Sequence, residues 1–331
     1  MPYSFRPAAL SGVGVWAAIQ GGSRCGKTLT ALRLARGIAG PTGKIAAADT
    51  EGRRMSAFAQ RPELPEQHGE DGKWRYHFDV YDMRSPYDPD RFCDIVAAAE
   101  AAGYAAMIID SFSLEWSGIG GVLHRYDVEF ARLGGDQKNS NTAWRVAKKP
   151  HRAMRDRLLQ SAMPIIFCIR ANEVAEHLAG GRKGTWKSEQ DARFIYEWTF
   201  SLTMHSETPG IVRYDLKTPT GEDAWKMPPD LRGLFPDGKI ITEAAGEGVQ
   251  AWRNSHATAV ASEPEGPSDE QISVFLADCA LQAQNGTAHY KAWWPSQDPS
   301  LRRRVTKDDR ARFGDAAREA DARVAEEAGA P

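Results

Sequence analysis

Short apolar runs alternate with longer amphipathic stretches along the first two thirds of the chain. The apolar runs predict strands over residues 15–20, 43–49, 74–81, 105–110 and 164–169. Apolar side chains recur at helical spacing from Leu29 to Ile38 and from Phe92 to Ala99, and a third helix is expected over residues 141–161. Strands that alternate with helices in this way favour an α/β fold with a mostly parallel central sheet flanked by helices.

The pattern changes in the last third of the chain. Residues 194–205 and 211–217 are typical of a hairpin at the end of the sheet, so the core domain is expected to span residues 1–245. Small residues and closely spaced Pro and Gly predict a linker over residues 246–268. Helical spacing then returns, which predicts a small helical C-terminal domain over residues 269–331.

Composition narrows the class of protein. The chain has 331 residues and a formal net charge of −2, so it can form about two domains and has no overall basic field. Any contact with nucleic acid must therefore be local. The four cysteines lie far apart without C-x-x-C pairing, which favours reduced thiols in the cytoplasm. No apolar run is long enough for a membrane span, and the N-terminus does not resemble a signal peptide.

One motif carries most of the candidate chemistry. Residues 21–28 form a complete G-x-x-x-x-G-K-[ST] loop between a predicted strand and a predicted helix. Glycines let backbone N–H groups wrap phosphate groups, and the helix N-terminus adds a favourable dipole. Lys27 is expected to reach the β- and γ-phosphates of ATP, and the Thr28 hydroxyl to bind Mg²⁺. The predicted nucleotide-binding residues of the loop are Gly21, Gly22, Ser23, Arg24, Cys25, Gly26, Lys27 and Thr28.

Two carboxylates are expected to complete this site. Asp110 ends an apolar strand downstream of the loop, where a carboxylate can hold Mg²⁺. Many AAA+ ATPases place a catalytic Glu directly after this Asp, but Ser111 stands there, so the water-activating carboxylate must come from elsewhere. Glu51 follows the strand after the loop helix and can orient a water against the γ-phosphate. The alternative is that Glu51 is a solvated loop acid.

The order of these motifs resembles the RecA-type ATPase core. The phosphate loop is followed by Asp-x-Glu, then apolar-Asp-Ser, then a strand that ends in Ile-Arg-Ala-Asn at residues 169–172. The chain is especially similar to the short phage-encoded RecA-like ATPases associated with single-strand annealing recombination. Those proteins often have Asp-Thr-Glu-Gly and Ile-Asp-Ser at these places, as residues 49–52 and 109–111 do here. The resemblance covers about residues 10–220.

The resemblance implies a RecA-like P-loop NTPase fold and Mg²⁺-dependent ATP hydrolysis in the cytoplasm of a bacterial host cell. Lys27, Glu51 and Asp110 would be the catalytic residues, with Thr28 and Asp110 at the metal. Arg170 or Asn172 would sense the γ-phosphate. A homo-oligomer is also implied.

Single-stranded DNA is the partner that the resemblance implies, in phage homologous recombination or annealing. RecA-like cores contact DNA through loops after these strands, and the second such segment is residues 173–191. Arg182, Lys183 and Lys187 can neutralise phosphates there, and Trp186 can stack on a base. A surface hairpin with ordinary charges is the alternative. The C-terminal domain would bind a recombination partner, an annealing protein or a single-strand-binding protein.

Two other classes of function use the same loop. One is a nucleotide or small-molecule kinase, although the sequence has no clear lid motif. The other is a nucleotide-dependent switch or assembly factor without DNA binding.

Overall fold

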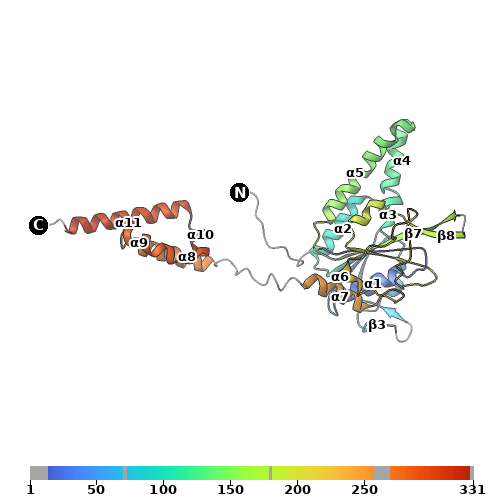
Figure 1. Cartoon of the computed structure of the whole chain (residues 1–331), viewed down its shortest axis with the longest axis horizontal. Coiled ribbons are helices and arrows are strands. Elements are labelled where there is room, and N and C mark those ends of the chain that lie inside the picture. Colours follow the sequence, from blue (N-terminus) through green and yellow to red (C-terminus); the bar gives the residue numbers. More distant parts are fainter. Residues whose placement is uncertain (1–13, 70–72, 179–180, 256–268, 329–331) are drawn as a thin grey trace. The chain divides into compact units, whose positions relative to one another are not determined.

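The computed structural model describes residues 14–69, 73–178, 181–255 and 269–328 (Figure 1). The chain divides into two compact units, Met1–Ala259 and Val260–Pro331. The first unit contains the phosphate-loop motif and all the predicted site residues.

A mostly parallel sheet forms the centre of the first unit. Its strands follow the order β5 (Asp79–Asp82), β2 (Ile45–Asp49), β6 (Ala106–Asp110), β7 (Ile165–Leu178), β1 (Trp16–Gly21) and β9 (Phe200–Met204). Neighbours along this path pair in parallel, whereas β8 (Gly181–Ser188) pairs antiparallel with β7. Asp49 is in register with Asp110, and Gly21 with Arg170. The carboxyl ends of β1, β2 and β6 therefore meet Arg170 of β7 at one edge of the sheet.

Helices cover both faces of this sheet (Figure 1). On one face, α1 (Lys27–Ala39) and α7 (Glu243–Asn254) pack on alternate strand residues such as Ile19 and Ile108. On the other face, α2 (Pro89–Ala101) and α5 (Ser140–Leu158) pack on the intervening residues, such as Trp16 and Phe167. Both faces of each central strand are apolar because both are covered.

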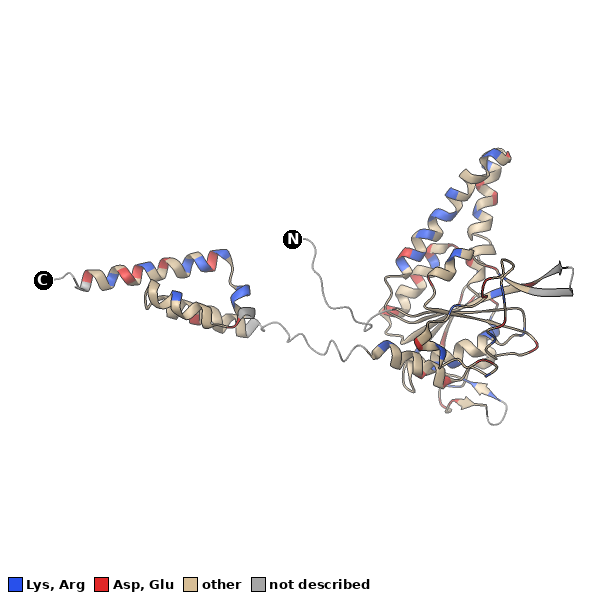
Figure 2. Ribbon diagram, in the orientation of Figure 1, with Lys and Arg blue, Asp and Glu red and all other residues tan. Residues whose placement is uncertain are grey.

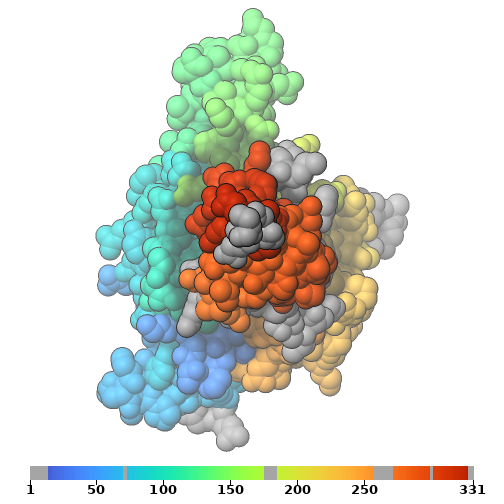
Figure 3. All heavy atoms as spheres, turned by 90° about the vertical axis from the view of Figure 1, so that its left-hand side faces the viewer, coloured from blue at the N-terminus to red at the C-terminus, as the bar shows by residue number. Residues whose placement is uncertain are grey.

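The remaining helices of the first unit are short or project from it. Helix α3 (Ser113–Ser117) follows β6, and α6 (Pro229–Arg232) precedes α7. Helix α4 (Val122–Arg132) pairs with α5, and the far end of this helix pair stands clear of the sheet (Figures 1 and 3). A two-stranded sheet joins β3 (Gln67–His68) and β4 (Trp74–Arg75).

Capping and glycine residues define the ends of two helices of this unit. The Asp88 side chain accepts a hydrogen bond from the N–H of Asp90, and Pro89 is the first residue of α2. Gly26 and Gly40 flank α1 with φ of 88° and 69°, a region of backbone conformation that glycine adopts without strain.

The second unit consists of helices around their own small core. They are α8 (Asp269–Ala283), α9 (Thr287–Trp293), α10 (Pro299–Arg304) and α11 (Lys307–Ala328). Phe275 and Phe313 are buried at the centre. The rings of Trp293 and Trp294 lie 6.1 and 6.2 Å from that of Phe275, so both tryptophans pack within the unit.

The predicted hairpin after β8 is wrong. Phe194 lies in a 3-10 turn, η3 (Ala192–Tyr196), and only Phe200–Met204 forms a strand, which pairs with β1 in parallel. Residues 211–217 make isolated bridges at Ile211 and Lys217. Two aromatic residues of this stretch, Phe194 and Trp198, are buried and pack against Trp16.

The strand expected over residues 74–81 is split between β4 and β5.

The linker predicted over residues 246–268 begins too early. Helix α7 occupies residues 243–254 and packs on α1 through glycine. A Cβ on Gly37 would lie 2.0 Å from the carbonyl oxygen of Glu243, and a Cβ on Gly246 would lie 2.3 Å from that of Leu34. The small residues therefore allow close packing of two helices and do not form a tether. Residues 256–268 of the predicted linker lie outside the described residues.

Candidate functional site

The phosphate-loop motif wraps around the N-terminus of α1. Gly21 and Gly26 have φ of 152° and 88°. A Cβ on Gly21 would lie 2.5 Å from the carbonyl oxygen of Met204, and one on Gly26 would lie 3.0 Å from the nitrogen of Gly210. Glycine is needed at both positions because the loop backbone presses against the chain that follows β9.

A cavity of about 530 Å³ lies over this loop at the carboxyl edge of the sheet. In open α/β sheets, ligands bind outside this edge. The fold brings the predicted residues Gly21, Gly22, Ser23, Arg24, Gly26, Lys27, Thr28, Glu51, Asp110, Arg170 and Asn172 to its wall. The Cys25 thiol is buried beneath the loop, and burial raises its pKa.

Thr28 and Asp110 meet at the base of this cavity. The Thr28 hydroxyl donates a hydrogen bond of 2.5 Å to Oδ2 of Asp110. Burial raises the pKa of Asp110 to about 6, although the Thr28 hydrogen bond and the charge of Lys27 act to lower it. A buried carboxylate with an incompletely balanced charge suits a bound cation.

These two oxygen donors fit magnesium. Mg²⁺ is commonly held by one or two protein oxygens together with water and substrate phosphates, so it does not need a cage of side chains. Among the residues that the structure describes, no group of three or more His, Cys, Asp or Glu forms such a cage.

Lys27 is folded back on its own loop. Its Nζ donates to the carbonyl oxygens of Gly21 and Gly22 over 3.0 and 2.7 Å. Carbonyl oxygens hold the ammonium group weakly compared with charged phosphate oxygens. The side chain is therefore positioned to exchange these partners for an anion that enters the cavity.

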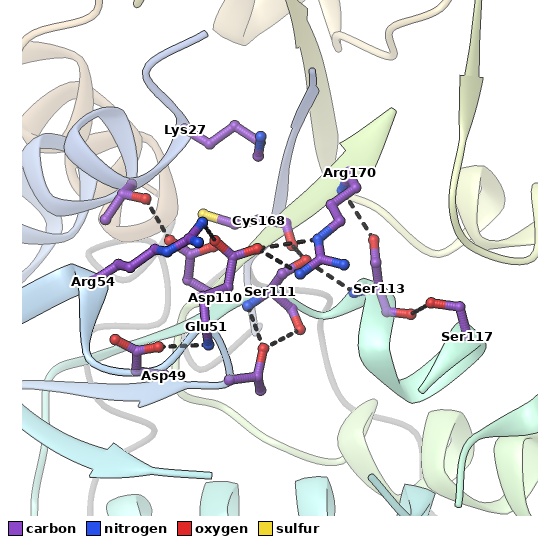
Figure 4. A network of polar contacts seen from close by, with 12 residues as sticks. Lys27, Asp49, Glu51, Arg54, Asp110, Ser111, Ser113, Ser117, Cys168 and Arg170 are labelled. Atoms are coloured by element: carbon purple, nitrogen blue, oxygen red, sulfur yellow. Dashed lines mark hydrogen bonds and ion pairs between the residues drawn. The ribbon is translucent and has the colours of Figure 1, made fainter. Parts of the chain in front are cut away.

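Glu51 is engaged by Arg170, as Figure 4 shows. Nε and Nη2 of Arg170 donate to Oε1 of Glu51 over 3.1 and 2.9 Å, and Arg54 lies 3.8 Å from Oε2. Asp49 fixes the turn that carries Glu51, because its carboxylate accepts hydrogen bonds from the N–H groups of Glu51 and Met55. Two predicted site residues, one just after β2 and one in β7, thus hold each other across the cavity.

Five further residues line the same cavity and were not predicted: Leu29, Arg54, Phe58, Ala171 and Glu189. Arg54 stands three residues after Glu51 in one turn, so this spacing could have indicated it. Glu189 follows β8, and its N–H donates to the carbonyl oxygen of Arg170 over 2.7 Å. No local motif marks Glu189, because its position depends on how β8 returns along β7.

The predicted DNA-binding segment is the β7–β8 hairpin. Lys187 is exposed there, whereas the side chains of Arg182 and Lys183 lie outside the described residues. The side chain of Trp186, which was expected to stack on a base, is 6% exposed and packs edge-on against His205. Lys and Arg also gather along α5 (Figure 2).

Comparison with protein-family models gives no match, and no curated protein matches the chain. Within the described ranges, no helix is both long and apolar enough to cross a membrane. The class that the fold defines is an α/β protein whose mostly parallel central sheet is flanked by helices.

Proposed function

We propose that the protein binds and hydrolyses ATP as a RecA-like P-loop ATPase, and acts on single-stranded DNA in phage homologous recombination. The observation that carries the proposal is the 2.5 Å contact between the Thr28 hydroxyl of the loop and the strand-end carboxylate of Asp110. A chance glycine-rich turn would have no reason to meet a buried acid there. In P-loop NTPases these two groups share Mg²⁺, which neutralises charge on the phosphates.

The loop residues have separate tasks in this proposal. Backbone N–H groups from Gly22 to Thr28 surround the phosphates at the N-terminus of α1. Lys27 releases the carbonyl oxygens of Gly21 and Gly22 and binds phosphate oxygens. Thr28 and Asp110 hold Mg²⁺.

Glu51 is the general base in this proposal. For that task its carboxylate must face a water next to the γ-phosphate and take a proton from it. The contact with Arg170 must then open, and the freed guanidinium can move to the γ-phosphate. Arg170 or Asn172 thereby senses whether the triphosphate is present.

The DNA part of the proposal rests on charge at the β7–β8 hairpin. Exposed Lys187, with Arg182 and Lys183 on the same strand, can bind strand phosphates. The second unit would recruit a recombination partner, such as an annealing protein or a single-strand-binding protein, and the core would act as a homo-oligomer in the host cytoplasm.

ATP turnover of the full chain, measured with and without single-stranded DNA, tests the proposal. We expect Mg²⁺-dependent release of phosphate that rises when the strand is added. Phosphate transfer to a nucleotide or small molecule would replace the proposal with a kinase. Tight nucleotide binding without hydrolysis, indifferent to DNA, would replace it with a switch or assembly factor.

A further inference from the structure

A second cavity, of about 370 Å³, lies beside the nucleotide cavity. Trp186, Phe194 and Trp198 supply aromatic walls, with Ile169 and Ile195. No residue described as lining the nucleotide cavity also lines this one. Its size and largely apolar lining are typical of small-molecule sites.

One buried polar group in this cavity has a free hydrogen-bonding atom. Gln20 is 6% exposed, and its Oε1 accepts a hydrogen bond from the Ser188 hydroxyl. Its Nε2 makes no hydrogen bond with any described residue. This nitrogen is not among the fully buried side-chain atoms without a partner in the described residues, so it is accessible and can donate to whatever enters the cavity.

The other polar groups lie around the wall and mouth. Exposed Lys187 and Glu222 line the cavity, together with Thr220. Asp191 also lines it but is paired with Lys148 at 2.7 Å. The lining therefore combines flat apolar surfaces, a buried amide donor, a carboxylate acceptor and an ammonium group.

We propose that this cavity binds a single nucleobase, presented either by single-stranded DNA or by a free nucleotide. A base has two flat faces that pack on aromatic rings. Its edge carries acceptors for the Gln20 amide and amino groups for Glu222. Lys187 can bind the attached phosphate.

A residue that lines the second cavity is the direct neighbour in sequence of the first residue of the phosphate loop. Gln20 directly precedes Gly21, whose carbonyl oxygen accepts a hydrogen bond from Lys27. On the other wall, a Cβ on Gly22 would lie 4.0 Å from Cζ3 of Trp186. Neither glycine lines the cavity, so a base there acts on the loop through its neighbours Gln20 and Trp186. This coupling extends the proposed DNA-dependent ATPase activity and rests on that proposal. Binding of the base does not rest on it.

Base binding is measured in the full chain carrying Lys27→Ala, which disables the phosphate loop. The probes are an oligothymidine strand with one 2-aminopurine, followed by fluorescence, and deoxyadenosine monophosphate, followed by calorimetry. Ala192→Trp fills the cavity from an exposed position on η3. Ala131→Trp, at an exposed position on α4, is the matched control. Gln20→Leu removes the donor at similar size.

We expect Ala192→Trp to weaken strand binding about tenfold and Gln20→Leu about fivefold, with loss of 2-aminopurine quenching. Ala131→Trp should change neither. If these variants also lose mononucleotide binding, free nucleotide can supply the base. If the protein binds the strand but not the mononucleotide, the base is supplied by DNA.

Unchanged affinity and quenching in Ala192→Trp would overturn the proposal even if Gln20→Leu fails to fold, as would an unmodified cavity that binds neither probe. Absence of ATP turnover in the wild-type chain contradicts only the proposed ATPase, so the two failures are distinguishable.

Discussion

The two cavities of the first unit differ in where their residues come from along the chain. The cavity over the loop is lined mainly by eight of the nine residues from Gly21 to Leu29 and by residues in or directly after β2, β6 and β7, and backbone geometry and charge dominate it. The second cavity draws on β1, β7, β8, η3 and residues 218–224, and ring packing dominates it. A local motif can therefore reveal one site, whereas the other exists only once the sheet has formed.

Lys27→Ala should have the largest effect of these substitutions, and that effect should be confined to the cavity over the loop. The substitution removes the mobile cation of the phosphate loop, so we expect at least a 100-fold loss of ATP turnover, measured by phosphate release. Folding should be intact, because the contacts of the Lys27 ammonium group are polar and lie within its own loop. Lys44→Ala, at an exposed position before β2, is the control. Wild-type turnover in Lys27→Ala would remove the basis for the ATPase proposal.

Glu51→Gln should keep ATP binding and lose about 100-fold or more in turnover, because an amide cannot accept the proton of water. Binding and single-turnover hydrolysis are measured separately, with exposed Glu63→Gln as the control. Normal hydrolysis would transfer the role to Glu189, which lines the same cavity. Glu115 is no substitute, since it is fully buried against His151.

Trp198→Ala tests how much the aromatic wall of the second cavity contributes to the stability of the fold. The ring is buried and packs on Trp16 and Phe167 at 5.9 and 5.0 Å. Its loss should lower the free energy of unfolding by about 3–5 kcal/mol, measured by urea denaturation. A stability change below about 1 kcal/mol would show that the wall of the second cavity contributes little packing.

Asp110→Asn should stabilise the protein, whereas Trp198→Ala should destabilise it. The pKa of Asp110 rises from 3.8 to about 6 in the fold, so ionisation destabilises the native state. This cost is absent below pH 4, grows between pH 4 and 6, and reaches up to about 3 kcal/mol above that range. The variant should therefore melt at a higher temperature than the wild type at pH 8 and at a similar temperature at pH 4. Equal melting temperatures at both pH values would contradict this.

Truncation after Ala259 should change neither cavity, because α7 remains on α1 and the second unit has its own core. Truncation after Ala245 removes most of α7 and should lower the melting temperature. Calorimetry of both chains distinguishes them. Equal melting temperatures would restore the linker boundary expected from composition.

The sequence predicts those parts of the fold that depend on neighbours along the chain. Helical spacing located α1 and α2, and a parallel sheet was enough to bring Glu51 and Asp110 toward the loop. The contact between Glu51 and Arg170 could not be foreseen, because it depends on the register of β2, β6 and β7. The sequence predicts that Trp186 can stack on a base, but it does not reveal that the ring is 6% exposed, because burial of an aromatic ring outweighs the polar character of its flanking residues.

The same limit explains the misplaced domain boundary. Glycine and alanine over residues 243–254 have two physical uses, free rotation in a tether and close approach of helices. Only the position of Gly37 on the facing helix decides between them.

The glycine contact between α1 and α7 has a mechanical consequence. Helix α7 is the last described element before the chain continues to the second unit, and α1 begins at the phosphate loop. Tension applied along that connection is borne first by α7, and through the close backbone contact at Gly37 it loads α1. A force on the tail of the protein would then reach Lys27 and Thr28, at the N-terminus of α1, through the contact between the two helices as well as through the sheet on which both pack.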